Sequence, residues 1–406
     1  MLGLGYRSET VHRSNLSAIV RALHEHGPLS RSELGVRTGL TRSAIRVLIG
    51  ELTELGLVDE GKAAALGTPG RPSSLVRPNP FGAVVMGIYV AVDSLDVAVV
   101  GLGGEILHRA SVDRPRGRIS VDQTVADLAE LVDGVWAATP GRDAVVGIGV
   151  AVAGLVRRSD GLVHNAPNLG WRDVPFCAQL SDALQTTVPL TVANEADMGA
   201  LAEYRRGAAI GAENLIYISS EVGVGGGVIV DGRPLTGVAG YGGEVGHMPV
   251  NPNGSACRCG SSGCWETEIG EGALLLRAGH RPGGGRGEVD LVLEEIAAGV
   301  PEALSAVDNV GRWLGVGLAI LVNVFNPDVV VLGGLLGRLH PFVLSRADAE
   351  SERLALGASL GLVRIIPSVL GGDAPLLGAA ELAFEPMLSD PLGWASVRSA
   401  SNAASA

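Results

Sequence analysis

Long apolar runs and targeting signals are missing from this 406-residue chain. No stretch of 18 residues is both apolar and free of charge, and residues 1–7 lack the basic flank and following apolar segment of a secretory signal. Proteins that span or cross a membrane need such segments. We therefore expect a soluble, cytoplasmic protein with no membrane partner, and its length predicts two or three domains.

Cysteine is scarce, and its few copies are clustered. Three of the four cysteines, Cys257, Cys259 and Cys264, follow His247 on a loop rich in Gly, Pro, Asn and Ser. One imidazole and three thiolates are the ligand set of a closed, structural, tetrahedral zinc site. Paired disulfides fit badly, because Cys177 is isolated and nothing else indicates an oxidising compartment. The sequence therefore predicts structural Zn²⁺ at these four residues, with a spacing unlike that of free-standing zinc fingers.

Several common catalytic motifs are absent as well. The chain contains no Walker A sequence, no H-E-x-x-H and no G-x-G-x-x-G after a predicted strand. The sequence GASLG at residues 357–361 matches the nucleophile elbow of α/β-hydrolases. It precedes a predicted strand instead of joining a strand to a helix, so we treat the match as chance.

Positive charge is in short supply, since the net charge is −12, but it is unevenly distributed. Residues 1–80 carry ten Lys and Arg against seven Asp and Glu, which gives +3. The remainder carries 21 against 36, which gives −15. A basic head on an acidic body is an asymmetry that indicates a nucleic-acid-facing segment.

The head has the pattern of a winged helix-turn-helix. Apolar periodicity predicts a helix over residues 15–26, a capping box opens a second over residues 31–38, and a third follows a turn at Gly39. The sequence GTPGRPSS at residues 67–74 would form the wing, and residues 71–80 have the composition of a linker. Residues predicted to contact DNA lie at the start of the third helix and on the wing: Thr41, Arg42, Ser43, Arg46 and Arg71.

The rest of the chain alternates apolar strands with helices, which is typical of α/β proteins. Three strands between residues 84 and 110 predict an antiparallel meander, and later helices are expected over residues 301–325 and around 341–354. We predict two α/β lobes with a cleft between them. The expected divisions are residues 1–80 for the DNA-binding domain with its linker, 81–194 with a C-terminal helix at about 374–388 for the first lobe, 195–373 for the second lobe with a zinc loop at 247–264, and 389–406 for a disordered tail.

With these elements in place, the chain closely resembles the ROK family of repressors, open reading frames and kinases. The resemblance spans nearly the whole chain, in the branch with an N-terminal winged helix. It is carried by GGEVGHMPV at residues 242–250 and CRCGSSGCWE at residues 257–266. The resemblance implies an actin-like, hexokinase-like pair of lobes with the ribonuclease H-like ATPase fold, zinc on the His and three Cys, and a hexose-type sugar in the cleft.

The resemblance also implies which residues hold the sugar. The family positions correspond here to Gly154, Asn194, Glu195, Glu244, His247 and Glu266, and Asn168 is expected at the same cleft. Such groups suit a polyol, because each hydroxyl both donates and accepts and charged acceptors make the stronger hydrogen bonds. From the residues alone, the alternative to sugar binding is a solvated loop acid for Glu244 and a helix cap for Asn194.

Kinases of the family use a catalytic Asp and two Gly/Thr loops that hold the ATP phosphates. Here Glu195 replaces the Asp, YVAVD at residues 89–93 replaces D-x-G-G-T, and residues 221–223 read E-V-G in place of G-T-G. Asp93 and Glu221 would therefore face a polyphosphate. One like-charge pair at about 4 Å costs roughly 4 kcal/mol at an effective dielectric of 20. We predict that the chain is not an enzyme and that Glu195 is a vestigial base.

The predicted function is a sugar-responsive transcription regulator that represses genes of carbohydrate uptake or catabolism. It would bind a double-stranded DNA operator as a homodimer or homotetramer, with a small sugar as effector. Two alternatives remain open. One is a ROK sugar kinase fused to a DNA-binding head, and the other is a regulator whose effector is a sugar phosphate or a partner protein.

Overall fold

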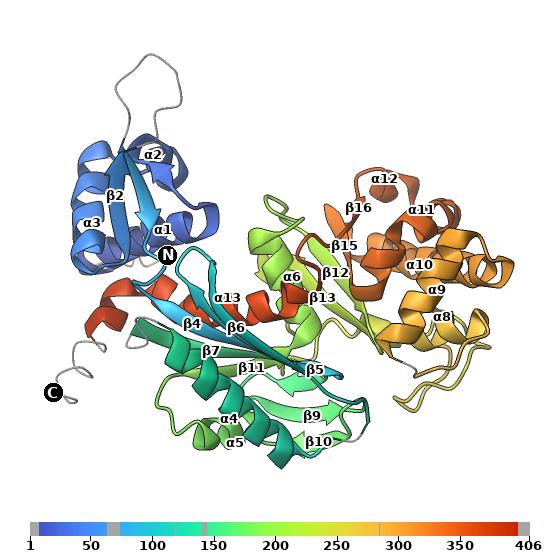
Figure 1. The fold of residues 1–406 in the computed structure, drawn as a ribbon. Coiled ribbons are helices and arrows are strands. Elements are labelled where there is room, and N and C mark those ends of the chain that lie inside the picture. Colours follow the sequence, from blue (N-terminus) through green and yellow to red (C-terminus); the bar gives the residue numbers. More distant parts are fainter. Residues whose placement is uncertain (1–7, 63–73, 118, 140–143, 284, 397–406) are drawn as a thin grey trace.

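The computed structural model describes residues 8–62, 74–117, 119–139, 144–283 and 285–396 (Figure 1). The N-terminal head lies against the first α/β lobe, and the second lobe lies on the far side of α6 (Figure 1). The C-terminal helix α13 returns to the first lobe and runs beneath the head. The described elements therefore run in the order head, first lobe, second lobe and returning helix.

The head is a helix-turn-helix with a small sheet of order β1-β3-β2. Its described elements are α1 (Ser8–His26), β1 (Leu29–Ser30), α2 (Arg31–Thr38), α3 (Arg42–Glu54), β2 (Val58–Lys62) and β3 (Ser74–Pro78). The Ser30 and Glu33 capping box starts α2, and Gly39 ends it at φ 70°, a conformation that favours glycine. The predicted bounds of α2 are therefore confirmed, whereas α1 begins seven residues earlier than predicted.

The predicted linker, residues 71–80, is wrong over residues 74–78, and residues 71–73 lie outside the described residues. Residues 74–78 form β3, which pairs with both β1 and β2 in the head. Strand pairing outweighs the flanking prolines, because Pro78 stands at the end of the strand and needs no ladder hydrogen bond there. The connection to the first lobe is correspondingly short, and a Cβ at Gly82 would lie 2.2 Å from the Gly56 carbonyl oxygen. The head is thus packed directly on the first lobe.

The first lobe is built on a sheet of order β11-β7-β4-β5-β6. Its strands are β4 (Val84–Val90), β5 (Ser94–Gly101), β6 (Ile106–Asp113), β7 (Val145–Val152) and β11 (Leu190–Asn194). Helix α4 (Val121–Ala138) packs on β5 and β6 and also contacts α5 (Phe176–Ala183), and α13 (Ala374–Ser389) packs on β4 and β7. A Cβ at Gly149 would lie 1.9 Å from the Ala379 carbonyl oxygen, so glycine is required for α13 to approach the sheet.

A small sheet of order β10-β9-β8 was not expected from the sequence. It consists of β8 (Leu155–Arg157), β9 (Leu162–Ala166) and β10 (Trp171–Val174). These short strands alternate too little to give a periodic signal. Val156, Val163 and Trp171 bury their side chains in the core that α4 and α5 also share. Tertiary packing therefore fixes this segment.

The second lobe is built on a sheet of order β14-β13-β12-β15-β16. Its strands are β12 (Leu215–Ser220), β13 (Val224–Val230), β14 (Arg233–Pro234), β15 (Val329–Gly333) and β16 (Arg364–Pro367). Helix α6 (Glu195–Arg206) packs on β12 and β13, and α11 (Gly334–Leu354) packs on β12, β15 and β16. The smaller helical elements are η2 (Val245–His247), α7 (Glu266–Ile269), α8 (Glu271–Arg277), α9 (Arg286–Ala298), α12 (Gly357–Leu360) and η3 (Gly371–Asp373).

Two long helices complete the core of the second lobe. Helix α10 (Pro301–Phe325) has the predicted bounds, and it packs along α11. By length and composition alone α10 could cross a membrane, but 61% of its most apolar window is buried inside the protein. Helix α11 begins directly after β15 instead of around residue 341, because its first turn continues from Gly333 and Gly334 and tolerates Pro341 in its interior.

The C-terminal segment is more ordered than predicted. Residues 391–396 are helical, and Leu392 and Trp394 pack on the core that the head and first lobe share. Two large apolar side chains in a stretch of small residues were the signal for this contact. The remainder of the expected disordered tail, 397–406, lies outside the described residues.

Candidate functional site

A cavity of about 680 Å³ lies between the two lobes. The loop after β7, the start of α6, the segment around η2 and the start of α7 all contribute side chains to it. The residues predicted to bind sugar line this one cavity without exception: Gly154, Asn168, Asn194, Glu195, Glu244, His247 and Glu266. The structure therefore brings together positions that lie far apart in the sequence.

Asn194 is largely committed to the protein itself. Its Oδ1 accepts hydrogen bonds from the backbone N–H groups of Ala196 (2.7 Å) and Asp197 (3.2 Å), which caps α6. Its Nδ2 donates to the Gly154 carbonyl oxygen at 2.8 Å. A Cβ at Gly154 would lie 2.7 Å from the Ala166 side chain, so this loop is tightly fitted. Asn194 thus fixes the wall of the cavity and keeps one amide hydrogen for a ligand.

Glu195 already has a hydrogen-bond partner. The Tyr89 hydroxyl donates to Glu195 Oε2 at 2.6 Å. Burial raises the pKa of the Glu195 carboxyl, while the hydrogen bond from Tyr89 acts in the opposite direction. Tyr89, the donor, stands at the position that aligns with the acid of D-x-G-G-T in the sequence analysis. Glu195 therefore shares one carboxylate oxygen with an aromatic hydroxyl. The hydrogen bond from Tyr89 occupies one carboxylate oxygen of Glu195, whereas burial, the larger influence on its pKa, favours the protonated form.

His247 faces two directions at once. Its Nδ1 lies 3.7 Å from Cys257 Sγ, and its Nε2 lies 3.9 Å from Glu244 Oε2. Glu266 Oε2 accepts from the Val224 backbone N–H at 3.2 Å, and Glu266 Oε1 lies 3.4 Å from the same Cys257 sulfur. The two acids that flank the cysteines in the sequence therefore border both the thiol cluster and the cavity.

The four predicted metal ligands form one cluster. One ligand atom from each of His247, Cys257, Cys259 and Cys264 lies within 4.8 Å of the others, and all four cysteines of the chain are free of disulfides. Zinc with Zn–S bonds of about 2.3 Å places tetrahedral sulfur atoms about 3.8 Å apart. The observed Cys259–Cys264 sulfur separation is 3.6 Å. The donor set and its spacing therefore fit a tetrahedral zinc ion.

Backbone geometry supports this cluster. Gly263 has φ 67°, and a Cβ there would lie 1.6 Å from the Asn251 carbonyl oxygen. A bridge between Pro249 and Cys264 holds the two arms of the loop together. The glycine-rich composition that marked the loop in the sequence is thus needed to bring the thiols to one point.

The sequence predictions missed Arg258, which lines the cavity, and Asp197, which lies close enough to the cavity residue Glu244 to be affected by its charge. Arg258, between two of the predicted ligands, donates to Asn168 Oδ1 and so connects the second lobe with the first. Asp197 lies three residues into α6, where burial and then Glu244 raise its pKa to about 7. Two signals in the sequence could have identified them. Arg258 is a basic residue between two predicted metal ligands, and Asp197 is a second acid one turn beyond Asn194.

The opposite half of the cavity carries the residues that replace the phosphate loops. Asp93 is bound by Arg116 (3.1 Å) and by Arg286 (2.9 Å), and Arg116 also donates to Glu271 at 2.6 Å. Burial, followed by the nearby Glu195 and Asp93, raises the pKa of Glu221 to about 7. Ion pairs between the lobes thus occupy the part of the cavity that contains Asp93 and Glu221.

The predicted DNA-contacting residues of α3 are exposed and adjacent. Thr41 caps α3 through its Oγ1, which accepts from the Ala44 N–H at 3.3 Å. Arg42, Ser43 and Arg46 line a surface hollow together with two residues that the sequence predictions missed, Arg31 and Ser32. These two residues lie at the start of α2, where the sequence predicted only a capping box. Arg71 lies outside the described residues.

Known proteins with similar sequences match both lobes and the head of this chain. A family model described as the ROK family matches residues 85–385. The chain is similar to a xylose repressor of Bacillus spizizenii, with 31% identity over 386 residues and coverage of 93% of this chain and 97% of the relative. The similarity includes the head, because so large a share of the chain is matched.

Solved structures give the same picture. One is a ROK family transcriptional regulator described as a homologue of the E. coli Mlc protein, with 25% identity, a TM-score of 0.75 and coverage of 96% of this chain and 98% of that one. Another is a ROK family glucokinase from Streptomyces griseus in complex with glucose and AMPPNP, with 29% identity, a TM-score of 0.65 and coverage of 75% of this chain and 100% of that one. The predicted fold class, a winged helix-turn-helix followed by two actin-like lobes, is confirmed, and the chain belongs to the ROK family.

Proposed function

We propose that this chain is a transcription regulator whose binding to operator DNA responds to a sugar held in the cavity. The observation that carries the proposal is the joining, in one chain, of an exposed basic helix start at Arg42, Ser43 and Arg46 to a cavity lined by polar residues of both lobes. The similarity to a xylose repressor over head and body supports it. Repression of carbohydrate genes is the corresponding biological role.

The proposal includes a structural zinc ion. His247, Cys257, Cys259 and Cys264 would hold it, and their donor set and spacing support this assignment. When bound, zinc supplies four bonds that fix the loop between η2 and α7. The chain's own residues then do the rest: Glu244 and Glu266 border the cavity, and His247 Nε2 points toward Glu244. The sugar would be held by the seven predicted residues, with Arg258 as an eighth candidate.

A sugar kinase is the second candidate, because Glu195 places a carboxylate at the base position and a glucokinase matches three quarters of this chain. The nucleotide half of the cavity argues against it. Asp93 is bound to two arginines, and Glu221 adds a second acid where phosphates would lie. ATP phosphates would have to displace the arginines from Asp93, and a charged Glu221 would repel a close phosphate by roughly 4 kcal/mol at an effective dielectric of 20. We propose that the chain has no kinase activity.

The proposed partners follow from this function. Double-stranded operator DNA would be contacted by Thr41, Arg42, Ser43, Arg46 and Arg71, with Arg31 and Ser32 beside them. Recognition helices of this type read half-sites about one helical turn apart, so we propose a homodimer or homotetramer. Such a protein would act in the cytoplasm, with no membrane partner.

The decisive experiment measures sugar binding, DNA binding and phosphorylation on the same protein. Melting temperatures with D-xylose, D-glucose and N-acetylglucosamine identify a stabilising sugar, and fluorescence anisotropy then follows binding to DNA selected in vitro by the protein. We expect the sugar to change DNA affinity by about 5- to 150-fold, the usual range of allosteric coupling. Arg42→Ala and Arg46→Ala should weaken DNA binding and leave sugar binding intact.

Other outcomes contradict the proposal in distinct ways. A wild type that none of the sugars stabilises is not a sugar sensor. ATP turnover that is lost in Glu195→Gln establishes the kinase instead. DNA binding that survives in both arginine variants places the DNA contact elsewhere on the head.

A further inference from the structure

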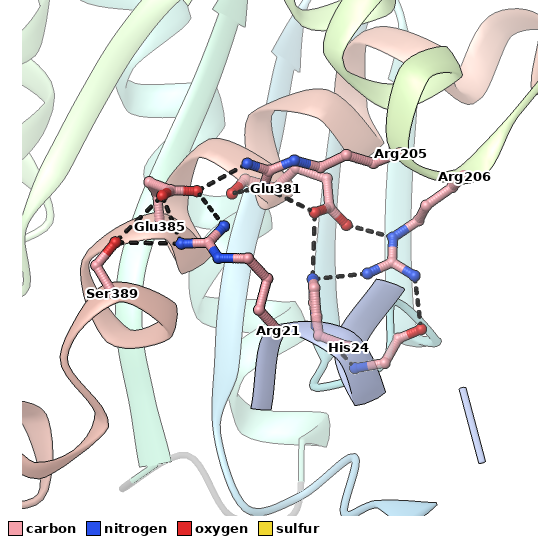
Figure 2. Close-up of polar contacts among 8 residues, drawn as sticks. Arg21, His24, Arg205, Arg206, Glu381, Glu385 and Ser389 are labelled. Atoms are coloured by element: carbon pink, nitrogen blue, oxygen red, sulfur yellow. Dashed lines mark hydrogen bonds and ion pairs between the residues drawn. The ribbon is translucent and has the colours of Figure 1, made fainter. Parts of the chain in front are cut away.

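A buried polar cluster lies where the head, α13 and α6 meet, outside the cavity and the DNA-contacting face (Figure 2). Its centre is Glu381 of α13, whose side chain is 1% exposed, and His24 of α1, whose side chain is fully buried. Arg205 and Arg206 come from the last turn of α6. We call these four residues, with Arg21 and Glu385 at their rim, the α1–α6–α13 junction.

Arg206 contacts three separate elements at once. Its Nε donates to Glu381 of α13, and its Nη1 donates to the Gly103 carbonyl oxygen in the β5–β6 turn at 2.8 Å. Its Nη2 lies 2.6 Å from His24 Nε2 of α1. A Cβ at Gly104 would lie 2.2 Å from the guanidinium carbon, so the turn is shaped around this side chain. Arg206 therefore ties the end of α6 to the head and to the first lobe.

Helix α6 connects this junction with the cavity. Its N-cap Asn194 and first residue Glu195 line the cavity, and its last two residues are Arg205 and Arg206. Twelve residues of α-helix span about 18 Å. Helices α6 and α13 cross in close contact, because a Cβ at Gly378 would lie 1.8 Å from the Met198 carbonyl oxygen. A displacement of the cavity end of α6 is thus carried to its other end and to α13.

Helix α1 of the head lies along α13 through a matching row of contacts. Arg13 donates to Asp390 (2.9 Å), the Ser17 hydroxyl donates to the Leu388 carbonyl oxygen (2.7 Å), and Arg21 donates to both Glu385 oxygens (3.0 and 2.7 Å). The spacing of these residues places them on one face of α1. The adjoining apolar face of α1 is buried in a core shared with Phe384 of α13. The head is therefore held on α13 along its first helix.

We propose that the α1–α6–α13 junction is the element that transmits the state of the cavity to the DNA-binding head. The inference rests on the proposed function, since it names how the sugar response would reach the DNA. Buried charged networks hold their geometry as a unit, because moving one member leaves another without its partner. Packed interfaces of this kind switch between discrete arrangements, as allosteric elements require. Arg206 is a positioning residue in this scheme and contacts neither sugar nor DNA.

The test compares Arg206→Gln with wild type and with Arg353→Gln, which removes the ion pair of an exposed arginine to Glu350 on α11, outside the junction. Three quantities are measured: the D-xylose and D-glucose affinities, the affinity for in vitro selected DNA, and that DNA affinity with the sugar at saturation. In wild type and Arg353→Gln we expect the sugar to change DNA affinity by about 5- to 150-fold. In Arg206→Gln both separate affinities should stay within about threefold, while the sugar effect falls toward onefold. A sugar effect of wild-type size in Arg206→Gln overturns the inference.

Hydrogen exchange of α1 tests the inference a second way, with neither ligand nor DNA present. Arg206→Gln should raise amide exchange over Ser8–His26 relative to Arg353→Gln, because the junction no longer holds the head. Unchanged exchange of α1 overturns the inference whether or not a sugar binds. Failure of the proposed function is a different result: neither sugar stabilises wild type. If Arg206→Gln does not fold, Arg21→Gln at the partly exposed rim gives the same comparison.

Discussion

The two ends of α6 hold acidic side chains in opposite electrostatic environments. At the cavity end, burial raises the pKa of Glu195 and raises that of Asp197 to about 7, and among the described residues no ion pair joins either acid to an arginine. At the junction end, burial acts on Glu381 and Glu385 as well. There His24, Arg206 and Arg205 hold the pKa of Glu381 well below its usual range, and Arg21 and Arg205 lower that of Glu385 to about 2.

Because of this difference, the acids at the cavity end of α6 can exchange hydrogen-bond partners, whereas the acids at the junction end are held by arginines. Carboxylates without a cationic partner keep hydrogen-bonding capacity for a polyol, whose hydroxyls both donate and accept. Carboxylates saturated by arginines have no such capacity, and their partners would be left uncompensated if they moved. One helix therefore joins a region suited to binding with a region suited to fixing the position of the head.

The largest effect is expected from a substitution in the cysteine cluster beside the cavity. Cys264→Ser deletes a fully buried ligand of the metal cluster. Structural zinc contributes about 10–16 kcal/mol of apparent binding free energy in small zinc domains. We expect the variant to lose bound zinc, measured by mass spectrometry of the metal, together with all stabilisation by sugar. The junction end should keep its contacts, so exchange over α1 should change little.

Cys177→Ser is the matched control, because Cys177 lies outside the cluster and its thiol donates only to the Leu190 carbonyl oxygen. It should retain zinc and the sugar response. A metal-free Cys264→Ser protein with the sugar response of wild type would show that the loop holds its shape without zinc.

The next effect acts at the junction end. Glu381→Gln removes the charge that compensates Arg205 and Arg206 in a buried site. Breaking a buried ion pair by changing one partner costs about 3–5 kcal/mol. We expect the free energy of unfolding, measured by urea denaturation, to fall by about that amount. Arg157→Gln, which removes an ion pair to Asp160 with both side chains exposed, should leave the denaturation midpoint close to that of wild type. Equal midpoints for the two variants would mean that the junction contributes no more than a surface pair.

The contrast between the two ends also shows what the sequence could predict. The clustering of His247, Cys257, Cys259 and Cys264 was predictable, because a histidine and three cysteines on one glycine-rich loop indicate a common ligand. Helices α2 and α10 were predictable because the signals for their ends and their periodicity lie within or next to each segment. Such local signals depend on residues that are close in sequence.

The junction was not predictable, because none of its signals is local. His24 and Arg206 are 182 positions apart, and each is typical of an ordinary helix surface. Asn194 shows the opposite problem: the sequence allowed both a helix cap and a sugar contact, and the structure shows the cap while placing the residue at the cavity. Strand β3 was missed because its flanking prolines favoured a linker, whereas pairing with β1 and β2 decided its structure.

A smaller effect compares the same chemical change at both ends. Glu244→Gln removes a charged acceptor from the cavity, and hydrogen bonds to charged groups contribute about 1.5–3 kcal/mol. Affinity for the stabilising sugar should fall by about 10- to 150-fold, as measured by isothermal titration calorimetry. Glu385→Gln at the junction should leave sugar affinity within about threefold of wild type. A Glu244→Gln protein that binds the sugar like wild type would assign Glu244 to the solvated loop instead.

The smallest expected effect is a pH dependence of stability, which should arise from His24 at the junction end. Burial lowers the pKa of this histidine from its ordinary value of 6.5, Arg206 and Arg205 act in the same direction, and Glu381 opposes them. The Gly103 backbone N–H donates to His24 Nδ1 at 3.0 Å, so a proton on that nitrogen would face another donor. The ring is therefore neutral when the head is docked and gains a proton more readily when the head is released.

The sign follows from proton linkage. Because the docked state binds the proton less well, its stability is full above pH 6.5 and decreases as the pH falls below that value. At pH 5.5 the loss can reach at most about 1.4 kcal/mol, the free energy of one pH unit. His24→Gln keeps an acceptor for Gly103 and a donor for Glu381 but cannot titrate. Urea denaturation at pH 7.5 and 5.5 should therefore show a larger acid destabilisation in wild type than in His24→Gln. An equal loss in both proteins would mean that other groups carry the acid response and that docking of the head does not exclude a proton from His24.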